Sequence, residues 1–76
     1  MVVNIPFPAR CATINDRRAF IKDICAWGDE NLQDQKTWQT RRNLVHQIRV
    51  TIQTKSIAFA LVHDEDAMAL KLAWCE

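Results

Sequence analysis

The sequence predicts an α+β fold, in which one domain over residues 1–76 packs a helix on a short antiparallel sheet in the order β-α-β-β-α. Three observations predict it: a β-branched run opens the chain, apolar residues then recur at helical spacing, and two later segments alternate along the chain. A domain of this size buries only about 60% of its unfolded surface. We therefore expect a thin core and exposed apolar residues.

The first strand is expected at about residues 2–6. This segment, VVNIP, is apolar and β-branched, and Pro6 and Pro8 end it. Because proline cannot donate to a strand ladder, it is tolerated only at the edge of a sheet. The segment is therefore predicted to be a short edge strand.

A helix is expected at about residues 15–27. Thr13 or Asn15 can cap its first turn. The residues that recur at helical spacing form one apolar stripe, namely Phe20, Ile21, Ile24 and Trp27. Gly28 is the only glycine in the chain and is expected to end the helix in the left-handed conformation. The polar residues 29–37 are predicted to form a loop.

Two strands are expected at about 45–53 and 56–62. The first segment also fits a helix with Trp38 and Val45 on one face, but its β-branched content and strict alternation favour a strand. A four-residue loop between the strands pairs large residues on a single face; the pairs are Ile52 with Ile57, Val50 with Phe59, and Ile48 with Leu61. The opposite face carries Ala58 and Ala60, which are too small to remain bare beside Val62.

The last segment, residues 66–74, fits both a helix and a strand. Alternation would place Leu70 opposite Phe59 in a further strand, giving the order β-α-β-β-β. Ala, Met, Leu and Lys are strong helix formers, however, and the acids from Asp64 suit a helix N-terminus. We predict a helix with Ala67, Leu70 and Trp74 as its apolar stripe.

The tail also resembles that of small uncharacterised phage-encoded proteins. Their pattern is F-x-F, polar or acidic residues, Asp-Ala, and an apolar run that ends in K-L-x-W. The matching residues here are Phe59, Asp66, Ala67, Leu70, Lys71, Leu72 and Trp74, and Ile57 stands where the pattern has its first aromatic residue. The resemblance covers the last third of the chain. It implies an origin in a phage or another mobile element, and the proteins it resembles share no common activity that could be transferred to this chain.

Bulk composition excludes several classes of protein. The net charge is +1, and no apolar run approaches the roughly 18 residues that a membrane span needs. The three cysteines do not form a disulfide framework, and no signal-peptide pattern opens the chain. We therefore expect a cytoplasmic protein that does not bind membranes.

Neither a catalytic motif nor a cofactor motif is visible. His63 stands beside three acids but lacks ligand spacing, so we expect a polar turn or helix cap and no metal site. Cys25 and Cys75 have no neighbouring base and are expected to be structural. Glycine-rich phosphate loops are absent from the sequence. The chain is thus predicted to be neither an enzyme nor a cofactor-binding protein.

The sequence instead favours a binding function, because tryptophan and arginine are enriched at interface hot spots. The candidate partner-binding residues are Trp38, Arg41, Arg42 and Arg49. We expect a small protein-binding module that acts, in an inhibitory manner or otherwise, on a host protein, with a second copy of the chain as another candidate partner. The alternative is nucleic-acid binding through a stripe in which Trp38 and His46 would stack between basic residues; the stripe would consist of Lys36, Arg41, Arg42, Arg49, Lys55 and Lys71.

Overall fold

A computed structural model describes residues 1–74 of the chain. Its element order is β1 (Val2–Pro6), α1 (Ile14–Asn31), α2 (Gln35–His46), β2 (Ser56–Ala60) and α3 (Asp64–Trp74). The fold is therefore α+β, as predicted, but the predicted order β-α-β-β-α is wrong, because a second helix replaces the middle strand. The predictions of a strand at 2–6 and of a helix in the last segment are confirmed.

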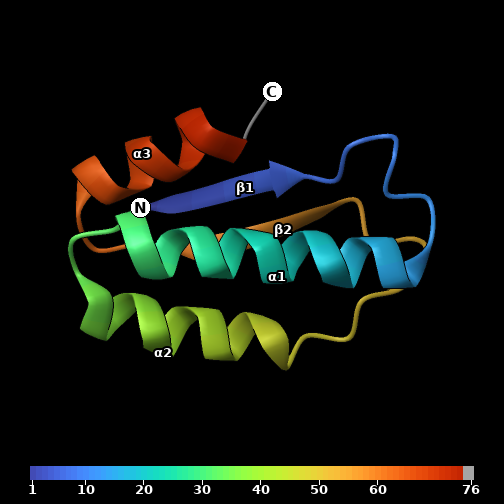
Figure 1. Cartoon of the computed structure of the whole chain (residues 1–76), viewed down its shortest axis with the longest axis horizontal. Coiled ribbons are helices and arrows are strands. Elements are labelled where there is room, and N and C mark those ends of the chain that lie inside the picture. Colours follow the sequence, from blue (N-terminus) through green and yellow to red (C-terminus); the bar gives the residue numbers. More distant parts are fainter. Residues whose placement is uncertain (75–76) are drawn as a thin grey trace.

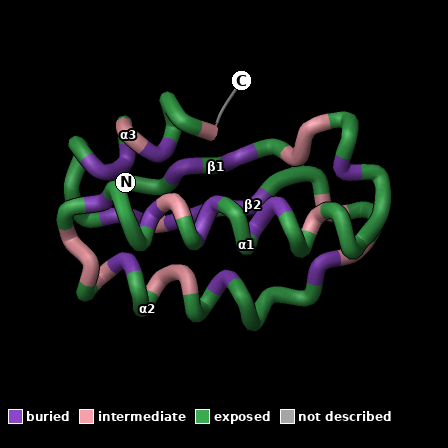
Figure 2. Tube along the Cα trace, viewed as in Figure 1, coloured by how far each residue is buried: buried purple, intermediate pink, exposed green. Residues whose placement is uncertain are grey.

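The two strands form an antiparallel sheet in which β1 pairs directly with β2. Val3 lies opposite Phe59 and Ile5 opposite Ile57, and these four side chains are all buried. Figure 1 shows α1 lying across the sheet, with α3 beside β1 and α2 beyond β2. Figure 2 shows the buried positions gathered along the strands and along the inner sides of the helices.

Helix α1 begins where the sequence indicates and ends later than predicted. The Thr13 hydroxyl accepts a hydrogen bond from the Asp16 backbone N–H at 3.1 Å, so Thr13 is the N-cap. The helix continues through Gly28 to Asn31, and Gly28 does not have a positive φ. The predicted left-handed ending is therefore wrong, and the segment 29–37 contains the last turn of α1 and the first turn of α2.

The predicted strand at 45–53 is also wrong. Asp34 caps α2 by accepting a hydrogen bond from the Thr37 N–H at 3.2 Å, and the helix runs to His46. Residues 47–55 then cross to β2 without regular structure. Their alternation does not mark one buried face: Val50 is 5% exposed, whereas Ile48 and Ile52 are 46% and 65% exposed. The partner of β2 is β1, so the predicted pairing of Ile52 with Ile57 does not occur.

Helix α3 has the apolar stripe that the sequence predicts. Ala67 and Leu70 are buried at 1% and 0% exposed, and Trp74 packs against the core. Met68 and Leu72 point away at 59% and 79% exposed. The segment forms a helix and not a strand, because its residues are strong helix formers and its first turn is acidic. No helix within residues 1–74 combines the length and apolarity needed to cross a membrane.

Candidate protein-binding surface

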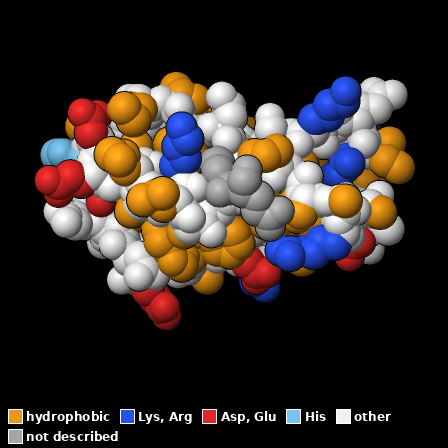
Figure 3. All heavy atoms as spheres, turned by 90° about the horizontal axis from the view of Figure 1, so that it is seen from above, with side chains coloured by type: hydrophobic (Ala, Val, Ile, Leu, Met, Phe, Trp, Pro, Cys, Tyr) orange, Lys and Arg blue, Asp and Glu red, His pale blue; other side chains and the backbone are white. Residues whose placement is uncertain are grey.

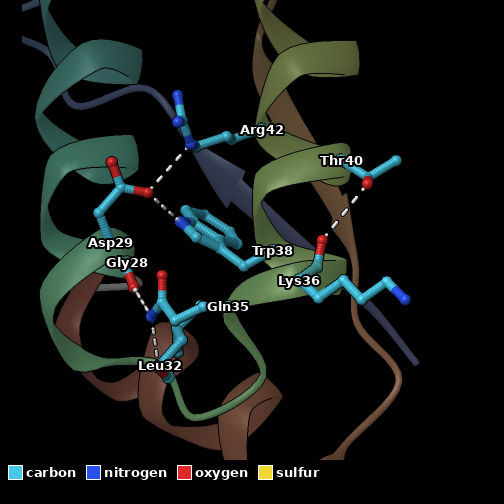
Figure 4. A network of polar contacts seen from close by, with 8 residues as sticks. All are labelled: Gly28, Asp29, Leu32, Gln35, Lys36, Trp38, Thr40 and Arg42. Atoms are coloured by element: carbon cyan, nitrogen blue, oxygen red, sulfur yellow. Dashed lines mark hydrogen bonds and ion pairs between the residues drawn. The ribbon is translucent and has the colours of Figure 1, made fainter.

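The structure places Trp38 in the core. Its side chain is 1% exposed, and its ring lies 5.3 Å from that of Phe59. Its indole N–H donates to the Asp29 carboxylate at 2.9 Å, as Figure 4 shows. Because no atom of this ring is available to a partner, the predicted direct contact between Trp38 and a partner does not fit the structure.

The three predicted arginines do not form one patch around Trp38. Arg42 forms an ion pair with Asp29 at 3.0 Å, on the same carboxylate oxygen that Trp38 contacts (Figure 4). Arg41 is half-buried on α2, and Arg49 is exposed in the irregular segment after α2. Trp38 and Arg42 of α2 therefore lie together, and both connect α2 to Asp29 of α1. Arg49 is not part of this contact.

Gly28 explains how α1 and α2 approach each other so closely. A Cβ atom at this position would lie 2.2 Å from Cζ2 of Trp38, well inside van der Waals contact. The Gln35 side chain also donates to the Gly28 and Leu32 carbonyls, which closes the turn between the helices (Figure 4). The single glycine of the chain therefore serves close packing and not a left-handed helix end.

The acidic cluster that follows His63 connects α3 to the turn between α1 and α2. The buried Asp66 carboxylate accepts hydrogen bonds from the N–H groups of Gln33 at 3.0 Å and Asp34 at 3.2 Å. Its two oxygens thereby fasten the α1–α2 turn to the first turn of α3. The hydrogen bond from the Thr37 N–H, with the nearby His63, lowers the pKa of Asp34 below its ordinary value. Within residues 1–74, no group of three metal-ligating side chains comes together.

The described cysteines are buried. Cys11 and Cys25 are 5% and 3% exposed, and both are free thiols. Burial raises the pKa of the Cys25 thiol to about 11, which keeps it protonated at neutral pH. Because the thiolate is the nucleophilic form, Cys25 does not have the character of a catalytic cysteine. The predicted structural role of Cys75 lies outside the described residues.

The outer face of the sheet is not covered by a helix. Side chains alternate along a strand, so the residues between the buried ones point away from the helices. Val2 is 61% exposed on this face, and Ala58 is exposed on β2, opposite Asn4. Val62, two residues beyond β2, is 63% exposed. None of the outward-facing strand residues is charged; they are Val2, Asn4, Pro6, Ser56, Ala58 and Ala60.

A groove extends this face toward α3. It has a volume of about 510 Å³ and lies between the first residues of the chain and the outer side of α3. Met1 and Met68 are exposed on its two sides at 63% and 59%. Lys71 is the only charged residue in its lining. We call this set the sheet–α3 face, defined by Met1, Val2, Ala58, Val62, Met68 and Lys71.

The sheet–α3 face has the chemistry of a protein contact. Exposed methionine adapts to different partner shapes, and extended apolar patches mark interaction sites on soluble proteins. Figure 3, a view onto α3 and β1, shows hydrophobic side chains spread across this side, with acidic and basic residues interspersed among them. The sequence signalled part of this face, because the small residues Ala58 and Ala60 stand beside Val62. It did not indicate that β1 would supply the rest.

A search of known protein families, curated proteins and solved structures found no match to this chain. The candidate surface therefore rests on the geometry of the chain alone.

Proposed function

We propose that this protein is a non-enzymatic binding module that attaches to another protein through the sheet–α3 face. The observation that carries the proposal is the exposure of Val2, Val62 and Met68 around an uncharged strand surface. Removing such apolar area from water stabilises a complex by roughly 25 cal/mol per Å². The Asp29 and Asp66 carboxylates, in contrast, are used to hold the helices together.

The charge of the groove specifies the partner further. Lys71 stands at its edge without an acidic residue in the lining. A partner with an apolar surface and a carboxylate opposite Lys71 would bury the apolar area and pair the charge. The tail resemblance to phage-encoded proteins supports a host protein as this partner, and an accessory or inhibitory role in the host cytoplasm follows from that origin.

Nucleic-acid binding is the weaker alternative. Its predicted patch placed Trp38 and His46 among the basic residues. His46 is exposed, but Trp38 is buried and Arg42 is paired with Asp29. Backbone binding by the remaining lysines and arginines would be strongly salt-dependent. A binding measurement with DNA and RNA at low and moderate salt distinguishes the two functions.

The experiment compares matched variants of two exposed apolar residues. Met68→Asp places a charge in the sheet–α3 face, whereas Leu44→Asp places one on α2, where Leu44 is 50% exposed. Affinity capture from host extract, with mass spectrometry, should recover the same partner with wild type and Leu44→Asp and lose it with Met68→Asp. Lys71→Glu should weaken capture of that partner.

Circular dichroism should show that all variants are folded. Equal capture by Met68→Asp and Leu44→Asp would rule out the sheet–α3 face as the binding surface. If Met68→Asp instead converts a dimer of this chain into a monomer, the partner is a second copy and the proposed host protein is incorrect.

A further inference from the structure

A separate cavity lies at the other end of β1 and α3. It has a volume of about 260 Å³ and is enclosed by the segment after β1, by α1 and by the last turn of α3. Its walls are two prolines, two phenylalanines, Arg10, Ala73 and Trp74. Drug-sized ligands occupy cavities of about 300–1,000 Å³, so this one fits a single ring or a branched side chain.

The aromatic walls are held in fixed orientations. The Phe7 and Phe20 rings lie 5.7 Å apart, and Trp74 meets Phe20 edge-on at 5.6 Å and 82°. Trp27 also packs edge-on against Trp74, with the ring centres 6.4 Å apart and an angle of 84° between the ring planes. Edge-to-face contacts of this kind are favourable and directional. The cavity is therefore a preformed apolar site.

Arg10 gives the cavity a positive charge. Its guanidinium carbon lies 6.0 Å from the Phe20 ring centre, and the side chain belongs to an exposed residue. No carboxylate within residues 1–74 forms a salt bridge with it, and the lining contains no acid. Arg17, in contrast, donates hydrogen bonds to the backbone carbonyls of Cys11 and Thr51.

Trp74 contributes its ring to the same wall. Its Nε1 atom is buried and has no hydrogen-bond partner among the described residues. Because this atom is out of contact with solvent, a ligand in the cavity would contact the apolar part of the ring.

We propose that this cavity binds an aromatic or branched apolar group that carries a carboxylate. The apolar group would lie in the cavity against the wall formed by Phe7, Phe20 and Trp74, and the carboxylate would pair with Arg10. A free small acid and the C-terminal carboxylate of a peptide share this chemistry. The site lies away from the groove beside Met68 and does not depend on the proposed function.

The test uses N-acetyl-phenylalanine as the free acid, its carboxamide, and the peptide Ala-Ala-Phe with a free C-terminus. Binding to the full chain is measured by NMR titration. The acid should bind about ten-fold more tightly than the amide, because a charge-assisted hydrogen bond is lost in the amide. Resonances of Phe7, Phe20 and Trp74 should shift.

Two variants identify the groups responsible. Arg10→Gln should remove the preference for acid over amide, while Arg18→Gln, an exposed arginine of α1 outside this cavity, should retain it. Trp74→Phe should weaken the binding of both compounds. Stronger binding of the peptide than of the free acid would identify a peptide terminus as the ligand, and equal binding would identify a small acid. No binding of either, or equal binding of acid and amide to wild type, would overturn the proposal.

Discussion

Trp38 and Trp74 occupy opposite situations in the same small core. Trp38 is 1% exposed, and its N–H has an acceptor in Asp29. Trp74 is partly exposed in the wall of a cavity, and its N–H has no acceptor among residues 1–74. The side chain of Trp38 is therefore enclosed and hydrogen-bonded within the fold, whereas Trp74 keeps part of its ring surface accessible to a ligand.

This difference shows why residue type alone does not identify an interface. Tryptophan and arginine are hot-spot residues when their surface is available. Trp38 and Arg42 both use their polar groups inside the molecule, because each contacts the Asp29 carboxylate. Near Trp74, Arg10 lies over Phe20 and has no paired carboxylate among residues 1–74, so the second arrangement is the better candidate for recognition.

The largest expected difference comes from truncating each tryptophan. Trp38→Ala should lower the free energy of unfolding by about 3–5 kcal/mol, because it opens a cavity at the centre of the core. Trp74→Ala removes a partly exposed ring and should cost roughly 1–2 kcal/mol. Urea denaturation followed by far-UV circular dichroism measures both values. Equal losses would contradict the distinction between the two residues.

An intermediate effect is expected at the helix contact that encloses Trp38. Gly28→Ala inserts a methyl group against the indole ring and should destabilise the protein by about 1–2 kcal/mol, since overpacking outweighs the better helix propensity of alanine. The same change in a Trp38→Leu background should be neutral or stabilising, because the ring is gone. A double-mutant cycle checks this coupling, and simple additivity would disprove the close-contact explanation.

The smallest effect is expected for Trp74→Phe, in a comparison that isolates the two indole N–H groups. Trp38→Phe removes a hydrogen bond to a carboxylate and should cost about 1–3 kcal/mol. Trp74→Phe loses no hydrogen bond within the described residues and should change the free energy of unfolding by less than about 1 kcal/mol. Thermal and urea unfolding of the pair provide the comparison. A larger loss at Trp74 would indicate an acceptor for its N–H in the folded protein.

Local signals predicted a substantial part of this fold. The β-branched run at 2–6, the Thr13 cap with the stripe through Phe20 and Ile24, and the helix formers of the last segment each agreed with the structure. These features act through residues that are neighbours in the sequence. The predicted strand at 45–53 is wrong, because the alternation of its apolar residues favoured a strand over the helical spacing of Trp38 and Val45. The Asp34 cap, which starts α2, was not among the predicted signals.

The sequence by itself determined the α+β class, the inner residues of β2 and the apolar stripe of α3, because backbone propensity and side-chain period are local properties. Only the tertiary structure decided that β1 would pair with β2 and that the Trp38 ring would pack against Gly28. It also decided that Trp74 and Arg10 would line one cavity. Those arrangements depend on contacts between residues far apart in the chain, which are selected by packing the whole core at once.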